Sequence, residues 1–172
     1  MKVTTGGQAR HFRTVAFDES KNSVLLIEQR LLPHEVKIIA TRTFRETARA
    51  ITDMVVRGAG AIGATAAYGL AQGARTFRGS HLKNFSEHIE KVYRVLKAAR
   101  PTAVDPVNAM NDLLVVMSVG KTVAEKQALA LSGAEEFANE DVKHCAAIGE
   151  FGAPLIRQGA RILTHCNAGW LA

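Results

Sequence analysis

The segment RILTHCNAGWLA, at residues 161–172, restricts the fold class of this chain more than any other feature. Its first five residues, 161–165, predict a short buried strand. Cys166 would then stand at the carboxyl end of that strand, followed by a turn that contains Asn167, Ala168 and Gly169. Open α/β sheets bind their ligands just beyond the carboxyl ends of the strands. We therefore expect the start of an α/β sheet with a thiol at its ligand-binding edge, and a chain that is the front part of an enzyme.

Three apolar or β-branched runs near the N-terminus predict a small antiparallel sheet between residues 13 and 40. The runs lie at residues 14–17, 23–27 and 36–40. Asp, Ser, Lys and Asn residues separate the first two, and this composition suits a tight turn.

Helical patterns dominate the next hundred residues. Thr43 or Thr47 could cap a first helix that carries Ile51, Met54 and Val55. The stretch 59–75 is rich in Ala and Gly, and such small residues would let a helix pack closely against its neighbours. Further helices are predicted from Ser86 to the stop at Arg100, from about 106 to 117, and from 122 to 148. Glycines then mark an exit, so we predict one domain at residues 1–150, and a linker with the start of a second domain at 151–172.

The composition is that of a globular protein, because 47% of the residues are hydrophobic and 22% are charged. The formal net charge of +6 permits attraction to anions such as phosphorylated sugars. No dense run of Lys and Arg with interleaved aromatic residues is present, so we expect no nucleic-acid partner. The sequence shows no signal peptide and no apolar stretch long enough to cross a membrane. We therefore expect a cytoplasmic protein with free thiols and no membrane partner.

Residues 56–63, VRGAGAIG, are a candidate anion site. Unpaired N–H groups at a helix N-terminus favour anions, and the guanidinium of Arg57 would add a charged fork. Gly58, Gly60 and Gly63 fit the pattern G-x-G-x-x-G, but the preceding residues predict a helix rather than the strand that a dinucleotide site requires. The alternative is a tight turn between helices with a surface arginine. Arg100, held by the proline after it, has the same two interpretations, as a phosphate contact or as a simple helix stop.

Cys166 also has two interpretations. A buried cysteine is most often a small apolar residue, whereas a thiol at a strand end could act as an acid, a base or a nucleophile. His165 would point to the opposite face of the strand and makes a poor partner. Cys145 lies within a helical pattern, and we interpret it as structural. The histidines and cysteines show no metal-ligand spacing, so we expect no metal.

Three separated segments, taken together and in this order, resemble the methylthioribose-1-phosphate isomerase family. They are MVVRGAGAIG at 54–63, RPTAV at 100–104 and ILTHCNAG at 162–169. FDES at 17–20 and LIEQRLLPHE at 26–35 are similar to the opening of the same family. That family is related to ribose-1,5-bisphosphate isomerase and to the regulatory subunits of translation initiation factor 2B.

The resemblance implies an α+β N-terminal domain, with a small antiparallel sheet and a helical bundle, followed by the first strand of a truncated Rossmann-like α/β domain. It also implies an aldose–ketose isomerase of methionine salvage that acts on 5-methylthioribose 1-phosphate, as a homodimer and without a cofactor or a metal. By motif, Cys166 would be the catalytic acid or base. The substrate phosphate would be held by Arg57, Gly58, Ala59 and Arg100, and the pocket would be shaped by Asn167, Ala168 and Gly169.

Two departures from the family pattern matter. The family has proline after Arg-Gly-Ala, where this chain has Gly60, and its catalytic aspartate lies downstream of the position of Ala172. We therefore expect this chain alone to be inactive. One alternative is ribose-1,5-bisphosphate isomerase, which needs a second phosphate site in place of a methylthio pocket. The other is a non-catalytic regulatory subunit of the initiation factor 2B type, which would have no need of an active-site thiol.

Overall fold

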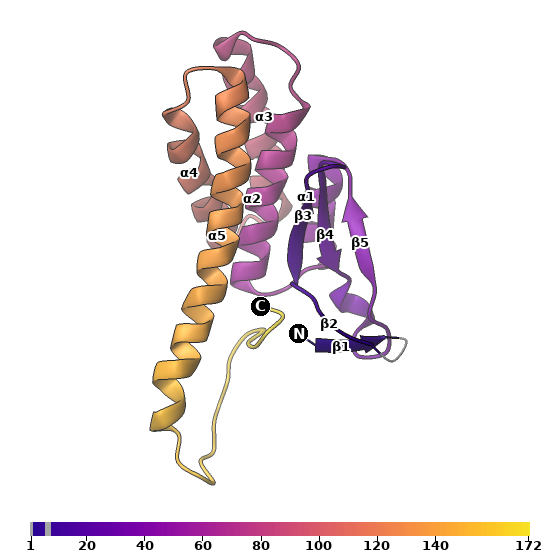
Figure 1. Ribbon diagram of the computed structural model, residues 1–172, viewed down its shortest axis with the longest axis vertical. Helices are drawn as coiled ribbons and strands as arrows, with labels where there is room; N and C mark the ends of the chain where they lie inside the picture. The colour runs from indigo at the N-terminus through magenta and orange to yellow at the C-terminus, as the bar shows by residue number, and fades with distance from the viewer. Residues whose placement is uncertain (1, 6–7) are drawn as a thin grey trace.

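The computed structural model describes residues 2–5 and 8–172 of the chain. A small sheet and a helical bundle stand side by side in it (Figure 1). Helix α1 (Phe44–Thr52) contacts the sheet at β5 and the bundle at α2 and α3. The sheet contains β3 (Val15–Asp18), β4 (Ser23–Ile27) and β5 (Ile38–Thr41), and the bundle contains α2 (Ala59–Thr76), α3 (Leu82–Ala99), α4 (Asp105–Ser118) and α5 (Val123–Gly152).

The sheet is an antiparallel meander in the order β3-β4-β5. Val15 pairs with Leu26 on one side of β4, and Val24 pairs with Thr41 on the other. Val15, Leu26 and Val24 are all buried, which fixes the register because a shift by one residue would turn them outward. The predicted small antiparallel sheet is confirmed. A preceding antiparallel hairpin, β1 (Lys2–Thr5) with β2 (Gln8–His11), was not predicted.

Two helices begin with reciprocal caps. The Thr43 hydroxyl accepts a hydrogen bond from the Glu46 N–H at 3.2 Å, and the Glu46 carboxylate accepts one from the Arg42 N–H at 2.7 Å. Thr122 and Glu125 repeat this arrangement at the start of α5, with the Lys121 N–H as the second donor. Such pairs satisfy N–H groups that the helix itself leaves unpaired. Thr43, rather than Thr47, is therefore the cap of α1, while Met54 and Val55 follow the end of that helix.

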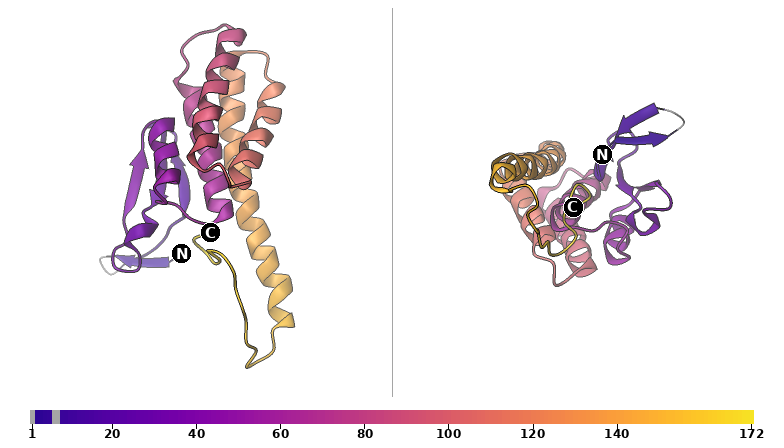
Figure 2. Two further views of the ribbon diagram at one scale, coloured as in Figure 1. Left: turned by 180° about the vertical axis from the view of Figure 1, so that it is seen from behind. Right: turned by 90° about the horizontal axis from the view of Figure 1, so that it is seen from below.

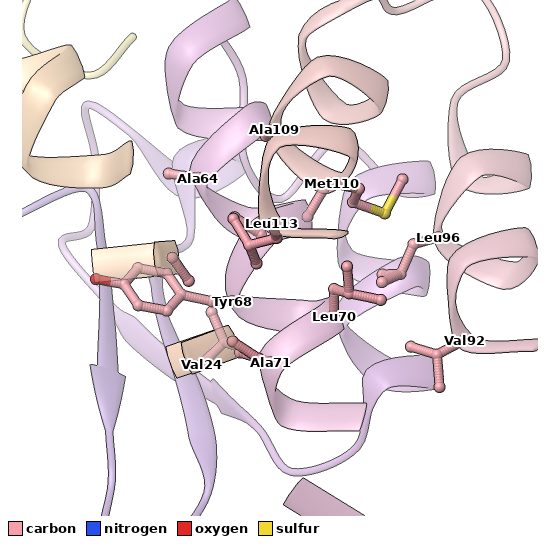
Figure 3. Close-up of a cluster of buried hydrophobic side chains, with 14 of the residues drawn as sticks. Val24, Ala64, Tyr68, Leu70, Ala71, Val92, Leu96, Ala109, Met110 and Leu113 are labelled. Atoms are coloured by element: carbon pink, nitrogen blue, oxygen red, sulfur yellow. The ribbon is translucent and has the colours of Figure 1, made fainter. Parts of the chain in front are cut away.

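Helix α2 is the centre of the molecule. Every residue from Ala61 to Ala74 is buried, and the helix contacts all four other α-helices as well as β3 and β4. Its glycines permit this closeness, because a Cβ at Gly73 would lie 2.5 Å from Cγ1 of Val92 on α3. Figure 3 shows Leu70 of α2 among the side chains of Val92, Leu96, Met110 and Leu113. The predicted close packing of the small-residue helix is confirmed.

A buried amide joins this helix to the sheet. Gln72 is fully buried, and its Nε2 donates to the carbonyl of Thr41 at 2.8 Å and to that of Asn22 at 2.9 Å. Its Oε1 accepts from the Thr47 hydroxyl at 2.8 Å. The side chain thus links α2 to the β3–β4 turn, to the end of β5 and to α1.

The C-terminal part of α5 leaves the bundle. Figures 1 and 2 show this end of the helix extending alone past the other helices, while the chain that follows it turns back toward the start of α2. We call residues 142–152 the distal part of α5. None of them is buried, and Ile148 and Phe151 are 72% and 75% exposed.

The strand predicted over residues 161–165 is wrong for the structure as described. These residues form no strand and are exposed, with Leu163 at 98%. A strand needs a neighbour for its backbone N–H and C=O groups, and the sheets of residues 2–5 and 8–172 contain β1 to β5 only. The predicted element requires strand partners that these residues do not supply.

Candidate functional site

Helix α2 begins at a turn that no side chain caps. Its N-cap is Gly58, with φ 98° and ψ 141°, a conformation that residues with a Cβ rarely adopt. Gly58 itself is buried, whereas Arg57 and Ala59 on either side are exposed. The first N–H groups of α2 therefore have no acceptor within the helix and can donate to groups outside it.

The last residues of the chain supply an acceptor at this turn. An oxygen of Ala172 accepts a hydrogen bond from the Ala61 N–H at 2.5 Å. Gln29 Nε2 donates to the Leu171 carbonyl and to the Arg57 carbonyl, both at 3.3 Å. This bond satisfies one of the N–H groups that the helix itself leaves unpaired at its start.

Arg100 reaches the same end of the bundle from the end of α3. Its Nη1 lies 3.2 Å from Sδ of Met54, which has a positive φ of 59° and precedes Arg57 by three residues. The Thr52 hydroxyl donates to the Ala99 carbonyl at 3.0 Å and ties these two chain segments together. The structure therefore brings the two predicted arginine segments to one region of the fold.

A cleft of about 640 Å³ opens beside the first turns of α2. Residues that precede or begin β3, the N-terminal turns of α2, one face of α5 and the C-terminal segment form its walls. Its charged side chains include Arg13 and Asp141, and Cys145 also lines it. The rest of the lining is largely small or apolar and includes Val15, Ala61, Ala64, Ala138, Val142, Ala146 and Ile148.

Asp141 is the acidic side chain of this cleft. Burial raises the pKa of its carboxyl, the charge of Asp105 raises this pKa further, and His144 lowers it. Both carboxylate oxygens lie against Gly60, in the space that a Cβ at that position would fill. An acidic group therefore borders the uncapped turn of α2.

The predicted site residues are only partly brought together. Gly169 lines the cleft, with φ 113°, and Arg57, Gly58 and Ala59 form the adjoining turn. Cys166, with φ 66°, is exposed in the segment that leads to Gly169, as are Asn167 and Ala168. The prediction that Cys166 is catalytic stays a prediction.

The face of α5 that lines the cleft was not predicted from the sequence. Ala138, Asp141, Val142 and Cys145 stand at positions i, i+3, i+4 and i+7, which places them on one side of a helix. Cys145, which we interpreted as structural, is exposed on this face. The spacing was available in the sequence, but it contains no motif that marks it as part of a site.

Within residues 2–5 and 8–172, no three His, Cys, Asp or Glu side chains form a group that could hold a metal ion. In the same part of the chain, no helix combines the length and hydropathy that a membrane-spanning segment requires.

The chain is similar to proteins of one known family. Residues 55–172 match the model of the initiation factor 2 subunit family. The chain therefore belongs to that family. A methylthioribose-1-phosphate isomerase 1 of Pseudothermotoga lettingae is 41% identical to it over 162 residues, which are 94% of this chain and 47% of that relative.

Two solved structures share the fold. The 5-methylthioribose 1-phosphate isomerase of Pyrococcus horikoshii is 41% identical, with a TM-score of 0.83 over 92% of this chain and 44% of that one. The translation initiation factor eIF-2B subunit delta of A. fulgidus is 37% identical, with a TM-score of 0.81 over 94% of this chain and 46% of that one. The chain thus spans about half the length of the relatives that it matches.

Proposed function

We propose that this chain is the N-terminal part of an aldose–ketose isomerase that converts 5-methylthioribose 1-phosphate to 5-methylthioribulose 1-phosphate in methionine salvage. The turn at residues 57–59 carries the proposal. An uncapped helix N-terminus with a glycine of positive φ and an adjacent arginine suits a phosphate dianion. The isomerase names of the relatives support the same substrate class.

The residues have the following roles in this proposal. Arg57, Gly58, Ala59 and Arg100 hold the phosphate, and Cys166 acts as a catalytic acid or base. The sugar end of the pocket is shaped by Asn167, Ala168 and Gly169. Residues 1–150 form one domain, and residues 151–172 are a linker and the start of a Rossmann-like domain that would carry Cys166 to the sugar.

The chemistry explains why these groups are needed. The phosphate sits on the anomeric carbon, so the ring cannot open as freely as that of an ordinary sugar. An acid must assist the opening, and a hydrogen must then move between C2 and C1 by an enediol-type proton transfer or a hydride shift. A thiol whose pKa is tuned by its surroundings suits the proton steps, while the arginines orient the sugar through its dianion.

The same proposal includes the setting of the protein. We infer a cytoplasmic homodimer that binds a small sugar phosphate and neither nucleic acid nor a metal. Sedimentation velocity on the purified chain tests the oligomeric state, because a dimer would sediment faster than an 18.6 kDa monomer.

Binding of 5-methylthioribose 1-phosphate tests the phosphate site directly. Isothermal titration with the 172-residue chain should detect binding, and Arg57→Ala should weaken it at least about tenfold through loss of a charged contact. Arg78→Ala is the matched control, since Arg78 is also exposed but follows the other end of α2. Equal binding by the Arg57 variant and the original chain would remove the phosphate assignment.

Catalysis is tested separately. We expect no isomerisation by this chain alone, because it spans only about half the length of the relatives that carry the isomerase name. In a protein that also includes that downstream half, Cys166→Ser should abolish turnover while leaving the fold and phosphate binding intact. Retained turnover would show that Cys166 is not the catalytic acid or base.

A second candidate function is that of a non-catalytic regulatory subunit of the initiation factor 2B type. The TM-score of 0.81 with an eIF-2B subunit favours it, because the fold alone fits that protein almost as well. This function predicts protein partners, no binding of 5-methylthioribose 1-phosphate, and no effect of Cys166→Ser on assembly.

A further inference from the structure

The cleft beside α2 is suited to an apolar group. Helix α2 contributes Ala61 and Ala64 to its lining, and α5 contributes Ala138, Val142 and Ile148. Gly60 belongs both to this lining and to the first turn of α2, whose N-cap is Gly58. A sugar whose 1-phosphate binds at that turn would therefore direct the rest of its carbon chain toward the cleft.

The carboxylate of Asp141 stands at the junction of the turn and the cleft. Its oxygens fill the space beside the Gly60 Cα where any other residue would carry a Cβ. Because Gly60 has no Cβ, this carboxylate can lie directly against its backbone. The pair Gly60–Asp141 thus joins the first turn of α2 to the cleft.

Asp141 forms no ion pair with a basic side chain in residues 2–5 and 8–172. Arg13 lines the same cleft, and its Nη1 donates to Oδ1 of Asn139 at 2.6 Å rather than to Asp141. The charged and titratable groups around it are Asp105 on α4, His144 and Cys145 on α5, and His11 and Arg13 before β3.

These surroundings already disfavour negative charge. Burial and then Asp105 raise the pKa of the Asp141 carboxyl, and the opposing effect of His144 is smaller. A second anion brought into the cleft would face this half-buried carboxylate at close range, where like charges repel each other.

We propose that Asp141 is a specificity-determining residue that keeps a second anionic group out of the cleft. The cleft would then accept sugar 1-phosphates whose C5 substituent is uncharged and apolar, and reject sugar 1,5-bisphosphates. This inference rests on the proposed function, because it assumes that the 1-phosphate binds at the turn of residues 57–59.

Calorimetric titration with two probes tests the inference. At about pH 8, where carboxylates are ionised, the 172-residue chain should bind 5-methylthioribose 1-phosphate about tenfold more tightly than ribose 1,5-bisphosphate, the size expected for one unpaired repulsion. Asp141→Asn should bring the two affinities to within about twofold by strengthening bisphosphate binding.

Three variants control this experiment. Asp141→Ser removes the charge with a different side chain and should shift the ratio as Asp141→Asn does. Asp141→Glu restores the charge and should restore the preference. Glu140→Gln removes the neighbouring exposed acid, which does not line the cleft, and should change nothing. Thermal unfolding of each variant verifies that it is folded.

Each outcome has a separate meaning. An unchanged ratio in both Asp141→Asn and Asp141→Ser, with 5-methylthioribose 1-phosphate still bound, would overturn this inference and leave the proposed function standing. Equal binding of the two probes by the original chain would also overturn the inference alone. If the original chain binds neither probe, the inference and the proposed phosphate site fail together.

Discussion

Helices α2 and α5 are both rich in alanine and glycine, yet they are buried to very different degrees. Helix α2 is covered on every side from Ala61 to Ala74, whereas the buried residues of α5 end at Ala138. In the distal part of α5, Val142, Ile148 and Phe151 are 50%, 72% and 75% exposed. The two helices therefore differ in their neighbours more than in their composition.

The difference separates helix formation from helix burial. Helix α5 continues to Gly152 because backbone hydrogen bonds, good helix-forming residues and the Thr122 cap support it along its length. Helix α2 has no side-chain cap and contains glycines that weaken an isolated helix. Its stability has to come from tertiary packing, which is the larger contribution for most helices in proteins.

Shortening one large apolar side chain in each helix should reveal this contrast most clearly. Leu70→Ala in α2 should lower the free energy of unfolding by about 2–5 kcal/mol, because it leaves a cavity among side chains that cannot collapse into it. Ile148→Ala in the distal part of α5 should change this free energy by no more than about 0.5 kcal/mol. Urea denaturation followed by circular dichroism measures both, and similar losses would mean that the distal part of α5 is covered in solution.

A buried and a half-buried glutamine offer the next test. Gln72→Ala should lower the free energy of unfolding by about 1–3 kcal/mol, because it leaves the carbonyls of Asn22 and Thr41 without their donor in the core. Gln127 on α5 likewise donates to two carbonyls, those of Ala74 and Phe77, but it is only half-buried. Gln127→Ala should therefore lower the free energy of unfolding by less than about 1 kcal/mol, since water can replace the amide. A larger loss for Gln127→Ala than for Gln72→Ala would contradict the view that buried contacts stabilise α2.

Loss of the cap of α5 should have a smaller effect. Thr122→Ala removes the acceptor for the Glu125 N–H and should lower the free energy of unfolding by about 1 kcal/mol. Thr122→Ser keeps the hydroxyl and should therefore retain most of this free energy of unfolding. If Thr122→Ala is neutral, packing alone rather than the cap determines where α5 begins.

The smallest expected effect concerns Asp141, at the boundary between the packed and exposed parts of α5. Its pKa is raised in the folded protein, so its contribution to stability is fully present below its ordinary value of 3.8 and is lost as pH rises through the raised pKa. Asp141→Asn should therefore raise the melting temperature slightly at neutral pH and not at about pH 3. A lower melting temperature at neutral pH would indicate that the ionised carboxylate has a stabilising partner.

Local patterns predicted most of the fold because each followed from a local cause. The Thr43 cap, the polar turn before β4 and the small residues of α2 all act within a few residues of themselves. The strand expected at 161–165 was wrong because a strand depends on distant partners. The turn at Arg57 could be predicted from neighbouring residues alone. The place of Asp141 in the cleft could not, because it depends on the contact with Gly60, which is distant in the sequence.

The bonds of the Gln72 amide also determine how the molecule can open. Because one side chain joins the β3–β4 turn, the end of β5 and α1 to the central helix, the sheet cannot detach without leaving polar atoms unpaired in the core. The sheet and the bundle should therefore form one cooperative unit rather than two foldons. In native-state hydrogen exchange, the slowest amides of β4 and of α2 should report the same opening free energy, while amides of the distal part of α5 exchange through local fraying.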